Sequence, residues 1–582
     1  MCAFFSRQVR GLSCIRRSPF QTILPPSIRS FAHESLCSNE KPSSNNLTIA
    51  LTPAEDSLFS FLEYIQRLYA PTTHLRVAGG WVRDKLRGAE SDDIDIALDN
   101  VMGATFARFI TKFQRDRKLP PSSVGLVKAN SNKSKHLEVA TIAIQGFTVD
   151  FVHLRAEAYS LNSRIPNVTF ASPQDDANRR DLTINALFYN LHTREIEDFT
   201  GQGVMDLNQR LIRTPRDPER TFLDDPLRVL RALRFACDLQ FTLDKTLETA
   251  LLSQREIVHA MTRKVSRERI GIEVRKMLAG EDPARAFDFL RTFKLLDVVF
   301  GTPPCHSSEG SREALKYPPR PWTDLIQQRA SHILKYLQQS RWALAKYKIS
   351  NVESMAAILT PLFVTSVPKI LCHEHGSLHC ATFPSLPETK LIACSLDFLD
   401  MRETIVAALN INEIVEMLKE HVKWPKPAGK RVALIIEAIA TYPEDSVEKN
   451  DVDHCIQQFM WMTQYYSVIT PALTILIAAH SFDTESVEKK TALLQETMLQ
   501  AYLDLANTYV TREDEASADT VKPTRQLDGK TVQTRLGPGA SQAIARALGV
   551  LQVYYKVHPN ATLEDALAFL DRLAPRLRKS PV

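Results

Sequence analysis

The 582-residue chain is too long for a single hydrophobic core, so several domains are expected. No apolar run approaches the length of a membrane-spanning helix, which argues against an integral membrane protein. The net charge is +5, but five of the 72 basic residues lie in the first 33 positions, where there is no acidic residue. The other 67 basic residues equal the 67 acidic ones, so binding a polyanion would require a local basic patch.

Residues 1–33 are rich in Arg and Ser and contain no Asp or Glu. This composition is typical of a mitochondrial transit peptide, and the alternative is an untargeted disordered tail. We therefore predict a mitochondrial location, with cytoplasm and nucleus as further compartments that the sequence leaves open. Residues 34–50 are predicted to link this segment to the first folded element.

The first predicted helix begins at Thr52 and runs to about Tyr69, because Thr52-Pro53-Ala54-Glu55 has the pattern of a capping box with Pro at the first helical position. Four strands are expected after it, at 75–78, 93–98, 137–144 and 147–154. The segment 115–135 is rich in Pro, Ser, Asn and Lys, so we predict an irregular stretch that is either functional or disordered.

The run from Leu75 to Asp99 combines a two-glycine turn with a pair of carboxylates. Asp93 and Asp95 fall on one predicted strand and therefore point to the same face. Two carboxylates this close repel each other unless they share a divalent cation, and an oxygen-rich site suits Mg2+. Gly79-Gly80 precedes a short helix whose free N–H groups can bind phosphate. Either motif alone is weak, but together they favour nucleotidyl transfer.

From Arg220 onward, strand patterns almost vanish and amphipathic helical patterns follow. Helices are expected at 222–238, 244–253, 266–279, 283–295, 325–342, 403–420, 428–441, 452–465, 486–509, 539–556 and 562–577. Breaks are expected at 301–322, 442–451 and 511–538. The predicted fold class is α+β, with a small mixed-sheet head on the N-terminal side followed by an all-α neck, body and tail.

The nine Cys residues have no repeated CxxC spacing, which fits free thiols in a reducing compartment. One cluster, Cys372-His373-Glu374-His375 with His379 and Cys380, contains metal-ligating residue types. Its spacing matches no common structural zinc pattern, so we favour an ordinary loop over a zinc site.

Five motifs in chain order resemble those of the class II tRNA nucleotidyltransferases, the CCA-adding enzymes, and of the related bacterial poly(A) polymerases. The first motif is GGWVRD with DDIDIAL, within residues 79–98. The others begin at Arg179 (RRDLTINA), Asp198 (DFTG, ending at Asp206-Leu207), Asp224 (DDPLRVLRALRF) and Ser266 (SRERIG). The resemblance implies a catalytic head at 51–215, a base-reading helical neck at 216–300 and a tRNA-binding body and tail at 301–582.

The implied reaction is template-independent addition of CCA to the 3′ end of tRNA from CTP and ATP, with release of pyrophosphate. Asp93 and Asp95 would hold two Mg2+ ions, one lowering the pKa of the attacking 3′-hydroxyl and the other neutralising the triphosphate. Asp150 is the first choice for a third metal-binding carboxylate, because the resembling strand of the family carries an acid there, usually Glu. Glu138 is the rival choice.

Gly79 and Gly80 are expected to contribute backbone to nucleotide binding, because glycine has no Cβ to keep phosphates away. Arg83 can reach triphosphate oxygens with its planar guanidinium. By resemblance to the second motif, Arg180 and Asp181 hold the phosphate and the sugar of the nucleotide.

Asp225 and Arg228 are three residues apart and are predicted to lie on one face of a helix. A carboxylate accepts hydrogen bonds and a guanidinium donates them, which complements the amine and ring nitrogen shared by cytosine and adenine. Uracil and guanine present the reverse pattern and would leave buried polar groups unpaired. Arg231 and Arg234 continue the row and are expected to contact phosphate or stack on bases, the alternative being a surface ion-pair row.

The predicted partners are tRNA, CTP and ATP, with no membrane and no inferable protein partner. Clustered basic residues offer candidate tRNA contacts at Arg210, Arg213, Arg216, Arg220, Lys423, Lys426, Lys430 and Arg431. Such groups are more often a solvated face. The rival functions are CC-only or A-only addition, poly(A) synthesis, and RNA binding without catalysis. The intact Asp93 and Asp95 disfavour the last, since a binding module has no need for metal-binding acids.

Overall fold

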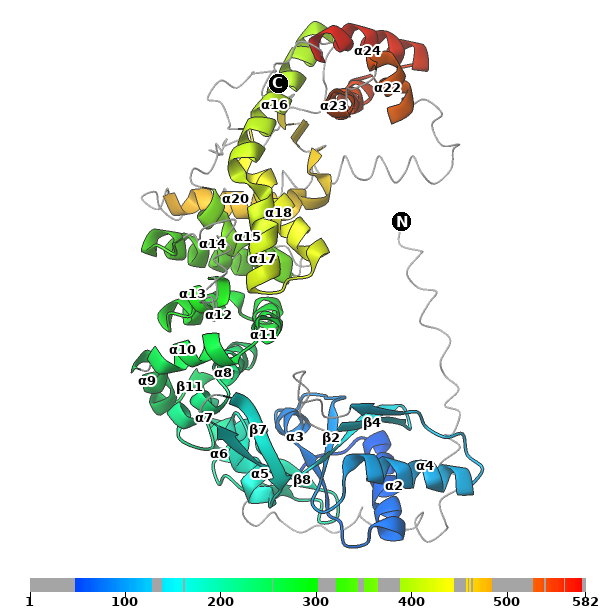
Figure 1. The fold of residues 1–582 in the computed structure, drawn as a ribbon, viewed down its shortest axis with the longest axis vertical. Helices are drawn as coiled ribbons and strands as arrows, with labels where there is room; N and C mark the ends of the chain where they lie inside the picture. The colour runs from blue at the N-terminus through cyan, green and yellow to red at the C-terminus, as the bar shows by residue number, and fades with distance from the viewer. Residues whose placement is uncertain are drawn as a thin grey trace, which may run out of the picture. The chain divides into compact units, whose positions relative to one another are not determined.

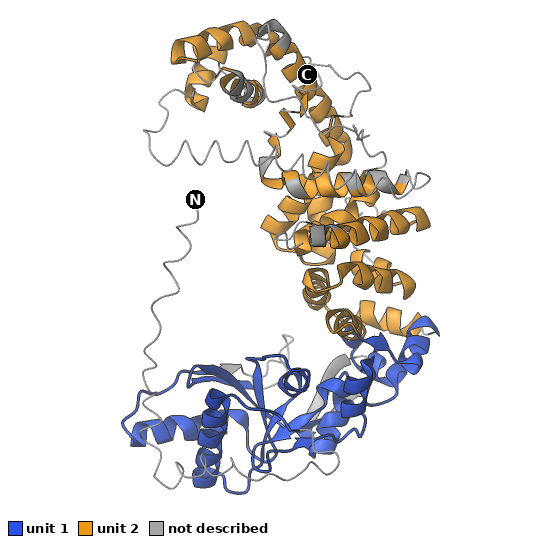
Figure 2. Cartoon of the chain, turned by 180° about the vertical axis from the view of Figure 1, so that it is seen from behind, with its two compact units in different colours: residues 1–228, 241–254 blue, residues 229–240, 255–582 orange. Residues whose placement is uncertain are grey.

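The computed structural model describes most of the chain between residues 48 and 577. The described ranges are 48–127, 139–160, 163–253, 255–301, 321–343, 350–364, 388–443, 457–458, 460–461, 464–483, 527–537, 541–558 and 561–577. They divide into two compact units, drawn in different colours in Figure 2. Unit 1 is Met1–Arg228 with Phe241–Gln254, and unit 2 is Val229–Gln240 with Arg255–Val582. The finer boundaries predicted after residues 33, 50, 215 and 300 stay predictions.

Unit 1 is built on a mixed sheet with the strand order β3-β4-β5-β2-β1-β8-β9 (Figure 1). Its strands are β1 (Leu75–Ala78), β2 (Ile94–Leu98), β3 (Val124–Val127), β4 (Val139–Ile144), β5 (Phe147–His153), β8 (Phe188–Asn190) and β9 (Ile196–Glu197). The neighbours β2 and β5 run parallel, whereas β1 pairs antiparallel with both β2 and β8. The predicted mixed-sheet head is therefore confirmed.

The first helix, α2 (Pro53–Tyr69), begins at the predicted capping box. Thr52 and Glu55 bond reciprocally, and the same buried Glu55 carboxylate accepts from Trp81 Nε1 at 3.1 Å and lies 3.0 Å from Lys85 Nζ. The cap therefore also fastens α2 to α3 (Gly80–Leu86), the short helix that follows the two-glycine turn. This is how a local helix signal becomes a tertiary contact beside the site.

The segment 115–135 is more regular than predicted. Its first residues end α4 (Gly103–Asp116), which packs on β4 and β5, and Val124–Val127 forms strand β3. Val124 pairs with Ile142 and Val127 with Val139, so β3 is stabilised by a partner strand that local composition does not reveal. Residues 128–135 lie outside the described ranges.

Beyond β5 the chain of unit 1 forms a hairpin and several short elements. They are β6 (Arg155–Ser160), β7 (Ser163–Phe170), α5 (Pro173–Arg179), η2 (Thr183–Asn185), α6 (Gly203–Gln209), β10 (Leu211–Ile212), α7 (Pro218–Asp224), β11 (Thr242–Leu243) and α9 (Lys245–Ser253). A cluster of Ala, Leu and Phe side chains from β1, β2, α5 and β8, and from the residues that follow β5 and η2, forms a common core: Ala78, Ala97, Leu154, Ala177, Ala186 and Phe188. The small side chains allow α5 to lie close to the strands.

The predicted helix at 222–238 is wrong in one respect: it is two helices. The first, α7, ends at Asp224, and α8 (Leu227–Asp238) begins after Asp225-Pro226. Asp225 is extended, with φ −134° and ψ 98°. Proline disfavours the helical conformation at the residue before it and lacks an N–H, so the break occurs at Asp225.

Unit 2 is helical throughout its described residues, with α10 to α18, α20 and α22 to α24 drawn from green to red in Figure 1. Its main helices are α10 (Arg255–Lys264), α11 (Arg267–Ala279), α12 (Pro283–Thr292), α14 (Asp324–Ala343), α15 (Asn351–Phe363), α16 (Glu388–Leu409), α17 (Ile411–His421), α18 (Lys426–Ala440), α20 (Ile469–Asp483), α23 (Ser541–Val557) and α24 (Leu563–Leu577). The predicted α+β class is thus confirmed. None of the described helices is long and apolar enough to cross a membrane.

Two expectations about the helical part need correction. The pattern at 403–420 spans two helices, because Asn410 takes a left-handed conformation, φ 53°, between α16 and α17. The predicted break at 511–538 contains a helix, α22 (Gly529–Leu536), capped by the Asp528 side chain. The predicted helix at 486–509 lies outside the described residues.

Gly103 offers a test of how α4 is held against the sheet. A Cβ at Gly103 would overlap the carbonyl group of Phe151 on β5. We expect Gly103→Ala to destabilise the protein by about 1–3 kcal/mol, the usual cost of overpacking, even though Ala is the better helix former. Thermal unfolding followed by circular dichroism would measure this. Gly125→Ala is the matched control, since its Cβ would meet Thr141 O at an ordinary 3.7 Å. Equal melting temperatures for both variants would contradict the expectation.

Candidate active site

Three carboxylates gather where β2 and β5 run side by side. Asp95 on β2 is the register partner of Asp150 on β5, so the two side chains leave the same face of the sheet. Asp93 is exposed and immediately precedes β2, two residues from Asp95. The pairing of β2 with β5 therefore adds Asp150 to the acid pair recognised from spacing alone. Glu138, the rival third acid, lies outside the described residues.

The electrostatics of this cluster are unfavourable for three negative charges. Burial, followed by the charges of Asp93 and Asp150, raises the pKa of Asp95 to about 6, and the nearby Arg180 offsets only part of this. The Oδ1 atom of Asp150 is buried and has no hydrogen-bond partner among the residues that the structure describes. A buried, unpaired carboxylate oxygen beside two other acids is what a cation would satisfy.

In the described part of the chain, no three His, Cys, Asp or Glu side chains are arranged to hold a metal ion by themselves. Mg2+ is usually bound by one or two carboxylates together with waters and substrate phosphates, and its binding at Asp93, Asp95 and Asp150 stays a prediction. The donor set of Asp93, Asp95 and Asp150 is all oxygen, and it fits Mg2+ better than the softer metals that prefer Cys or His.

The two-glycine turn is shaped by Arg180. Gly79 has φ +79°, and a Cβ there would lie 3.0 Å from Arg180 Nη1, so only glycine lets the guanidinium lie against the turn. Gly80 opens α3, and its Cβ would meet only Arg83 Nη2 at an ordinary 3.6 Å. The N–H of Gly79 donates to Leu187 O, which ties the turn to the segment before β8.

Arg83 is buried and bonded within the protein. Its guanidinium donates to both carboxylate oxygens of Asp84, at 2.9 and 2.7 Å, and through Nη1 to Asn185 Oδ1 at 2.6 Å. The predicted contact of Arg83 with a triphosphate stays a prediction. In this structure its visible role is to join α3 to η2.

Asn185 is a residue of this site that sequence reasoning missed. Its side chain accepts from Arg83 and donates to Asp181 Oδ1 at 3.2 Å, and its carbonyl oxygen accepts from Arg180 Nη1 at 3.0 Å. Asn185 thus holds three predicted nucleotide-binding residues. Asp181 Oδ1 also accepts from Leu182 N, so this one carboxylate oxygen receives two hydrogen bonds. The Asn lay within the second motif, but nothing in a single sequence distinguished it from its neighbours.

The structure arranges Asp225 and Arg228 differently from the prediction. Asp225 does not lie on a helical face: it caps α8, with Oδ1 accepting from Leu227 N at 3.3 Å and its carbonyl accepting from Arg228 N at 3.0 Å. Arg228 reaches back through Nη2 to Arg179 O at 2.8 Å. The predicted base-reading pair is thus anchored to the second motif inside unit 1.

Arg231 and Arg234 lie in unit 2. Arg234 is buried, donates to Glu273 Oε2 at 2.8 Å, pairs with Asp238 and stacks over the ring of Phe235. Arg231 is more exposed and lies 4.0 Å from Glu273. Arg234 therefore stabilises the packing of α8 on α11, and a nucleotide contact for either Arg stays a prediction.

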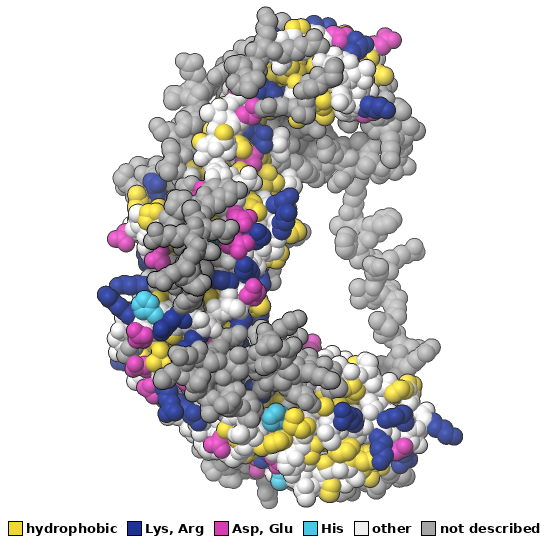
Figure 3. All heavy atoms as spheres, viewed as in Figure 1, with side chains coloured by type: hydrophobic (Ala, Val, Ile, Leu, Met, Phe, Trp, Pro, Cys, Tyr) yellow, Lys and Arg dark blue, Asp and Glu magenta, His cyan; other side chains and the backbone are white. Residues whose placement is uncertain are grey.

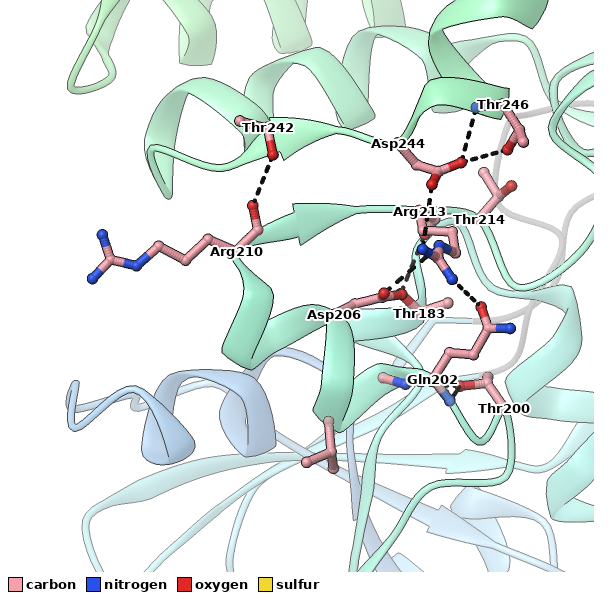
Figure 4. A network of polar contacts seen from close by, with 12 residues as sticks. Thr183, Thr200, Gln202, Asp206, Arg210, Arg213, Thr214, Thr242, Asp244 and Thr246 are labelled. Carbon is pink, nitrogen blue, oxygen red and sulfur yellow. Dashed lines mark hydrogen bonds and ion pairs between the residues drawn. The ribbon is translucent and has the colours of Figure 1, made fainter.

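Arg213, which was a candidate tRNA contact, makes hydrogen bonds and ion pairs with other side chains of unit 1 (Figure 4). It lies 3.6 Å from the buried Asp206, 3.3 Å from Asp244 and 2.9 Å from Gln202. Asp206 also accepts from Thr183 Oγ1, so the network joins the second and third motifs to the start of α9. Arg210 points away from it in Figure 4 and is exposed. On the face drawn in Figure 3, Lys and Arg are interspersed with Asp and Glu.

Lys426 and Lys430 are exposed on α18, whereas Trp424 beside them is buried and lies under Arg275. The cluster at 372–380, for which a loop was favoured over zinc, lies outside the described residues.

Two family models match the chain. Residues 75–213 match the poly A polymerase head domain, and residues 240–307 match a family described as the probable RNA and SrmB-binding site of polymerase A. The first match covers all the motif residues of the head up to β10, including the three carboxylates.

Curated relatives from fungi carry related names. The mitochondrial CCA tRNA nucleotidyltransferase of Saccharomyces cerevisiae is 43% identical over 263 residues, which are 43% of this chain and 48% of the relative. The tRNA nucleotidyltransferase cca2 of Schizosaccharomyces pombe is 41% identical over 42% of this chain and 51% of the relative. The chain thus spans about half the length of the curated relatives it matches.

A solved structure has the same fold over nearly the whole chain. The CCA-adding enzyme of Bacillus stearothermophilus in complex with CTP is 18% identical, with a TM-score of 0.51 over 91% of this chain and 100% of that one. At this identity the likeness concerns the fold alone. The resemblance inferred from the five motifs is confirmed. Residues 75–213 are similar to the poly A polymerase head domain, and curated fungal relatives that match this part of the chain are tRNA nucleotidyltransferases.

Proposed function

We propose that this chain adds CCA to the 3′ end of tRNA from CTP and ATP, without a nucleic-acid template. The observation that carries the proposal is the convergence of Asp93, Asp95 and Asp150 beside Arg180 in a poly A polymerase head domain. The names of the yeast relatives support tRNA as the substrate and, for the Saccharomyces cerevisiae relative, CCA as the sequence that is added. The match of residues 240–307 to an RNA-binding family supports RNA as the acceptor.

The three carboxylates would bind Mg2+, with the remaining positions left for water and triphosphate oxygens. Mg2+ bound there would lower the pKa of the attacking 3′-hydroxyl and neutralise charge on the triphosphate and the departing pyrophosphate. Two observations support this assignment: burial and neighbouring charges raise the pKa of Asp95, and Oδ1 of Asp150 has no hydrogen-bond partner among the described residues. A bound cation would stabilise both carboxylates in their ionised form.

Arg180 is the cation best placed to bind the triphosphate. Its side chain lies against Gly79 and close enough to Asp95 to lower the pKa of that carboxyl. A guanidinium beside the metal-binding acids can hold phosphate oxygens in line for attack. Asp181 would accept from the ribose hydroxyls, and its bonds to Leu182 N and Asn185 keep its carboxylate in one orientation.

Asp225 and Arg228 would select the base. Together they supply acceptors and donors that match cytosine and adenine and oppose uracil and guanine. Their bonds to the α8 N-terminus and to Arg179 O support this role, because a template made of side chains must be rigid to discriminate.

We also propose a mitochondrial location, with cytoplasm and nucleus as further compartments. The composition of residues 1–33 and the mitochondrial name of the Saccharomyces cerevisiae relative support it. The wider functions of the family, addition of A alone and synthesis of poly(A), are distinguished from CCA addition by the reaction products.

The proposed reaction is tested by extension of a tRNA that lacks its last three nucleotides. With Mg2+, we expect two additions from CTP and a third only when ATP is present, resolved at single-nucleotide length. Asp93→Asn or Asp95→Asn should lower incorporation by at least about 1,000-fold while tRNA binding is kept, because the metal-binding charge is lost. Asp92→Asn, next to the site in sequence, is the control and should stay near wild type. Long A tails, or extension only of tRNA ending in CC, would contradict the proposal.

Base selection is tested by Asp225→Asn. Asn can still cap α8, since it is as good a cap as Asp, but its amide can donate to a uracil carbonyl. We expect the preference for CTP over UTP, measured as a ratio of kcat/KM, to fall by about 10- to 100-fold. Glu219→Gln on α7 makes the same chemical change and should leave the ratio unaltered. An unchanged ratio in Asp225→Asn would remove Asp225 from base selection.

The proposed metal site has a measurable consequence for the stability of the folded protein. Since the pKa of Asp95 is raised to about 6, its ionised form costs stability above pH 6, and this cost is lost as the pH falls toward 4. Without divalent metal, we expect Asp95→Asn to stabilise the protein by about 2 kcal/mol at pH 8 and by little at pH 4. Mg2+ should raise the melting temperature of the wild type but not of the variant. Stabilisation that is equal at both pH values would contradict this account.

A further inference from the structure

Asp176 is a buried carboxylate that no motif or prediction assigned. It lies in α5 (Pro173–Arg179) and is only 1% exposed. It accepts four hydrogen bonds: from Arg179 Nε at 3.0 Å, Arg179 Nη2 at 2.6 Å, Arg180 Nε at 3.0 Å and Arg155 N at 3.2 Å. The donors belong to Arg179 and Arg180, which begin the second motif, and to Arg155, the first residue of β6.

The helix does not need Asp176 for its own cap. Ser172 caps α5 by accepting from Asp175 N, and the exposed Asp175 bonds back to the Ser172 hydroxyl. Burying a carboxylate is costly unless it is paired and fully bonded. Burial alone would raise the pKa of Asp176, but the charges of Arg180 and Arg179 with their hydrogen bonds hold it below its ordinary value. Asp176 is thus ionised, and its negative charge holds the two arginines in place.

The consequence is clearest for Arg180. Asp176 fixes its Nε, Asn185 O fixes its Nη1, and the ring of Phe188 lies 4.9 Å beneath the guanidinium carbon. Its Nη2 group donates to no residue in the described part of the chain, and the side chain remains 18% exposed. The two N–H groups of Nη2 are therefore held in one orientation. The positive charge of the same guanidinium acts to lower the pKa of Asp95.

We propose that Asp176 is a positioning residue, which fixes Arg180 so that its Nη2 group meets the triphosphate of the incoming nucleotide. This inference rests on the proposed nucleotidyl transfer. A guanidinium held at Nε and Nη1 loses little conformational entropy when it binds phosphate, so its affinity depends on the groups that hold it. The expected signature is a defect that depends on the phosphates and is the same for CTP and ATP, since both carry the same triphosphate.

The test is Asp176→Asn, which keeps the size of the side chain and removes the charge. We expect KM for CTP and for ATP to rise by the same factor, about 10- to 100-fold, with kcat changed by less than about threefold. Binding of cytidine, which has no phosphate, should be unchanged. Asp175→Asn changes an exposed carboxylate on the same helix and should leave both KM values within twofold of wild type.

A double-mutant cycle separates positioning from a general loss of structure. In an Arg180→Ala background, Asp176→Asn should have no further effect on KM, because the group that it positions is already gone. Additive effects, or equal losses for cytidine and CTP, would overturn the inference. If Asp176→Asn does not fold, Arg180→Lys tests the same geometry, since Lys keeps the charge but cannot make both fixed bonds. Wild-type CTP affinity in Arg180→Lys would overturn the inference as well.

The failure of the two proposals can be told apart. A wild-type protein that does not extend tRNA with CTP and ATP refutes the proposed function. An active wild type whose KM values are insensitive to Asp176→Asn refutes only the role of Asp176.

Discussion

Repulsion among three carboxylates is the constraint on which the rest of unit 1 depends. The parallel pairing of β2 with β5 sets Asp150 beside Asp95, and the protein supplies too little positive charge nearby to offset them. Burial, followed by the charges of Asp93 and Asp150, raises the pKa of Asp95, and Oδ1 of Asp150 has no hydrogen-bond partner among the described residues. Binding of a cation would relieve the repulsion among these carboxylates. The proposed metal affinity and the stability cost therefore have the same cause.

Around this acidic centre, the cations are restrained by bonds to other residues. Asp84 and Asn185 hold Arg83, and Asp176 and Asn185 hold Arg180. In unit 2, considered by itself, Glu273 holds Arg234 in the same way. A long side chain held at two nitrogens presents its remaining donors at little entropic cost. The same arrangement shows why an arginine in a motif need not touch a ligand: Arg83 and Arg234 are bonded internally, whereas Arg180 keeps donors available.

Several predictions followed from local pattern because their cause is local. The capping box at Thr52 and Glu55 predicted the start of α2, and the alternation of Asp93 and Asp95 predicted a shared face. Predictions were wrong where a local signal was given too little weight, or where a partner distant in the sequence determined the secondary structure. Pro226 ends the helical conformation at Asp225, although the hydrophobic pattern continues through it. Strand β3 exists because β4 pairs with it, which the composition of 115–135 could not reveal.

The sequence by itself determined the motifs, the family resemblance, the mixed-sheet head followed by helices, and the acid pair, because residue identity and short-range spacing encode all of these. Only the tertiary structure decided which groups hold the site in place. Asn185 bonds to Arg83 across about a hundred residues of chain, and Arg228 reaches Arg179 from α8. Asp176 is close in sequence to the arginines it holds, but its burial and its bond to Arg155 N arise from the packing of α5 on the sheet. Burial, which turns an ordinary carboxylate into an obligatory ion-pair partner, is a property of the folded chain and has no local signature.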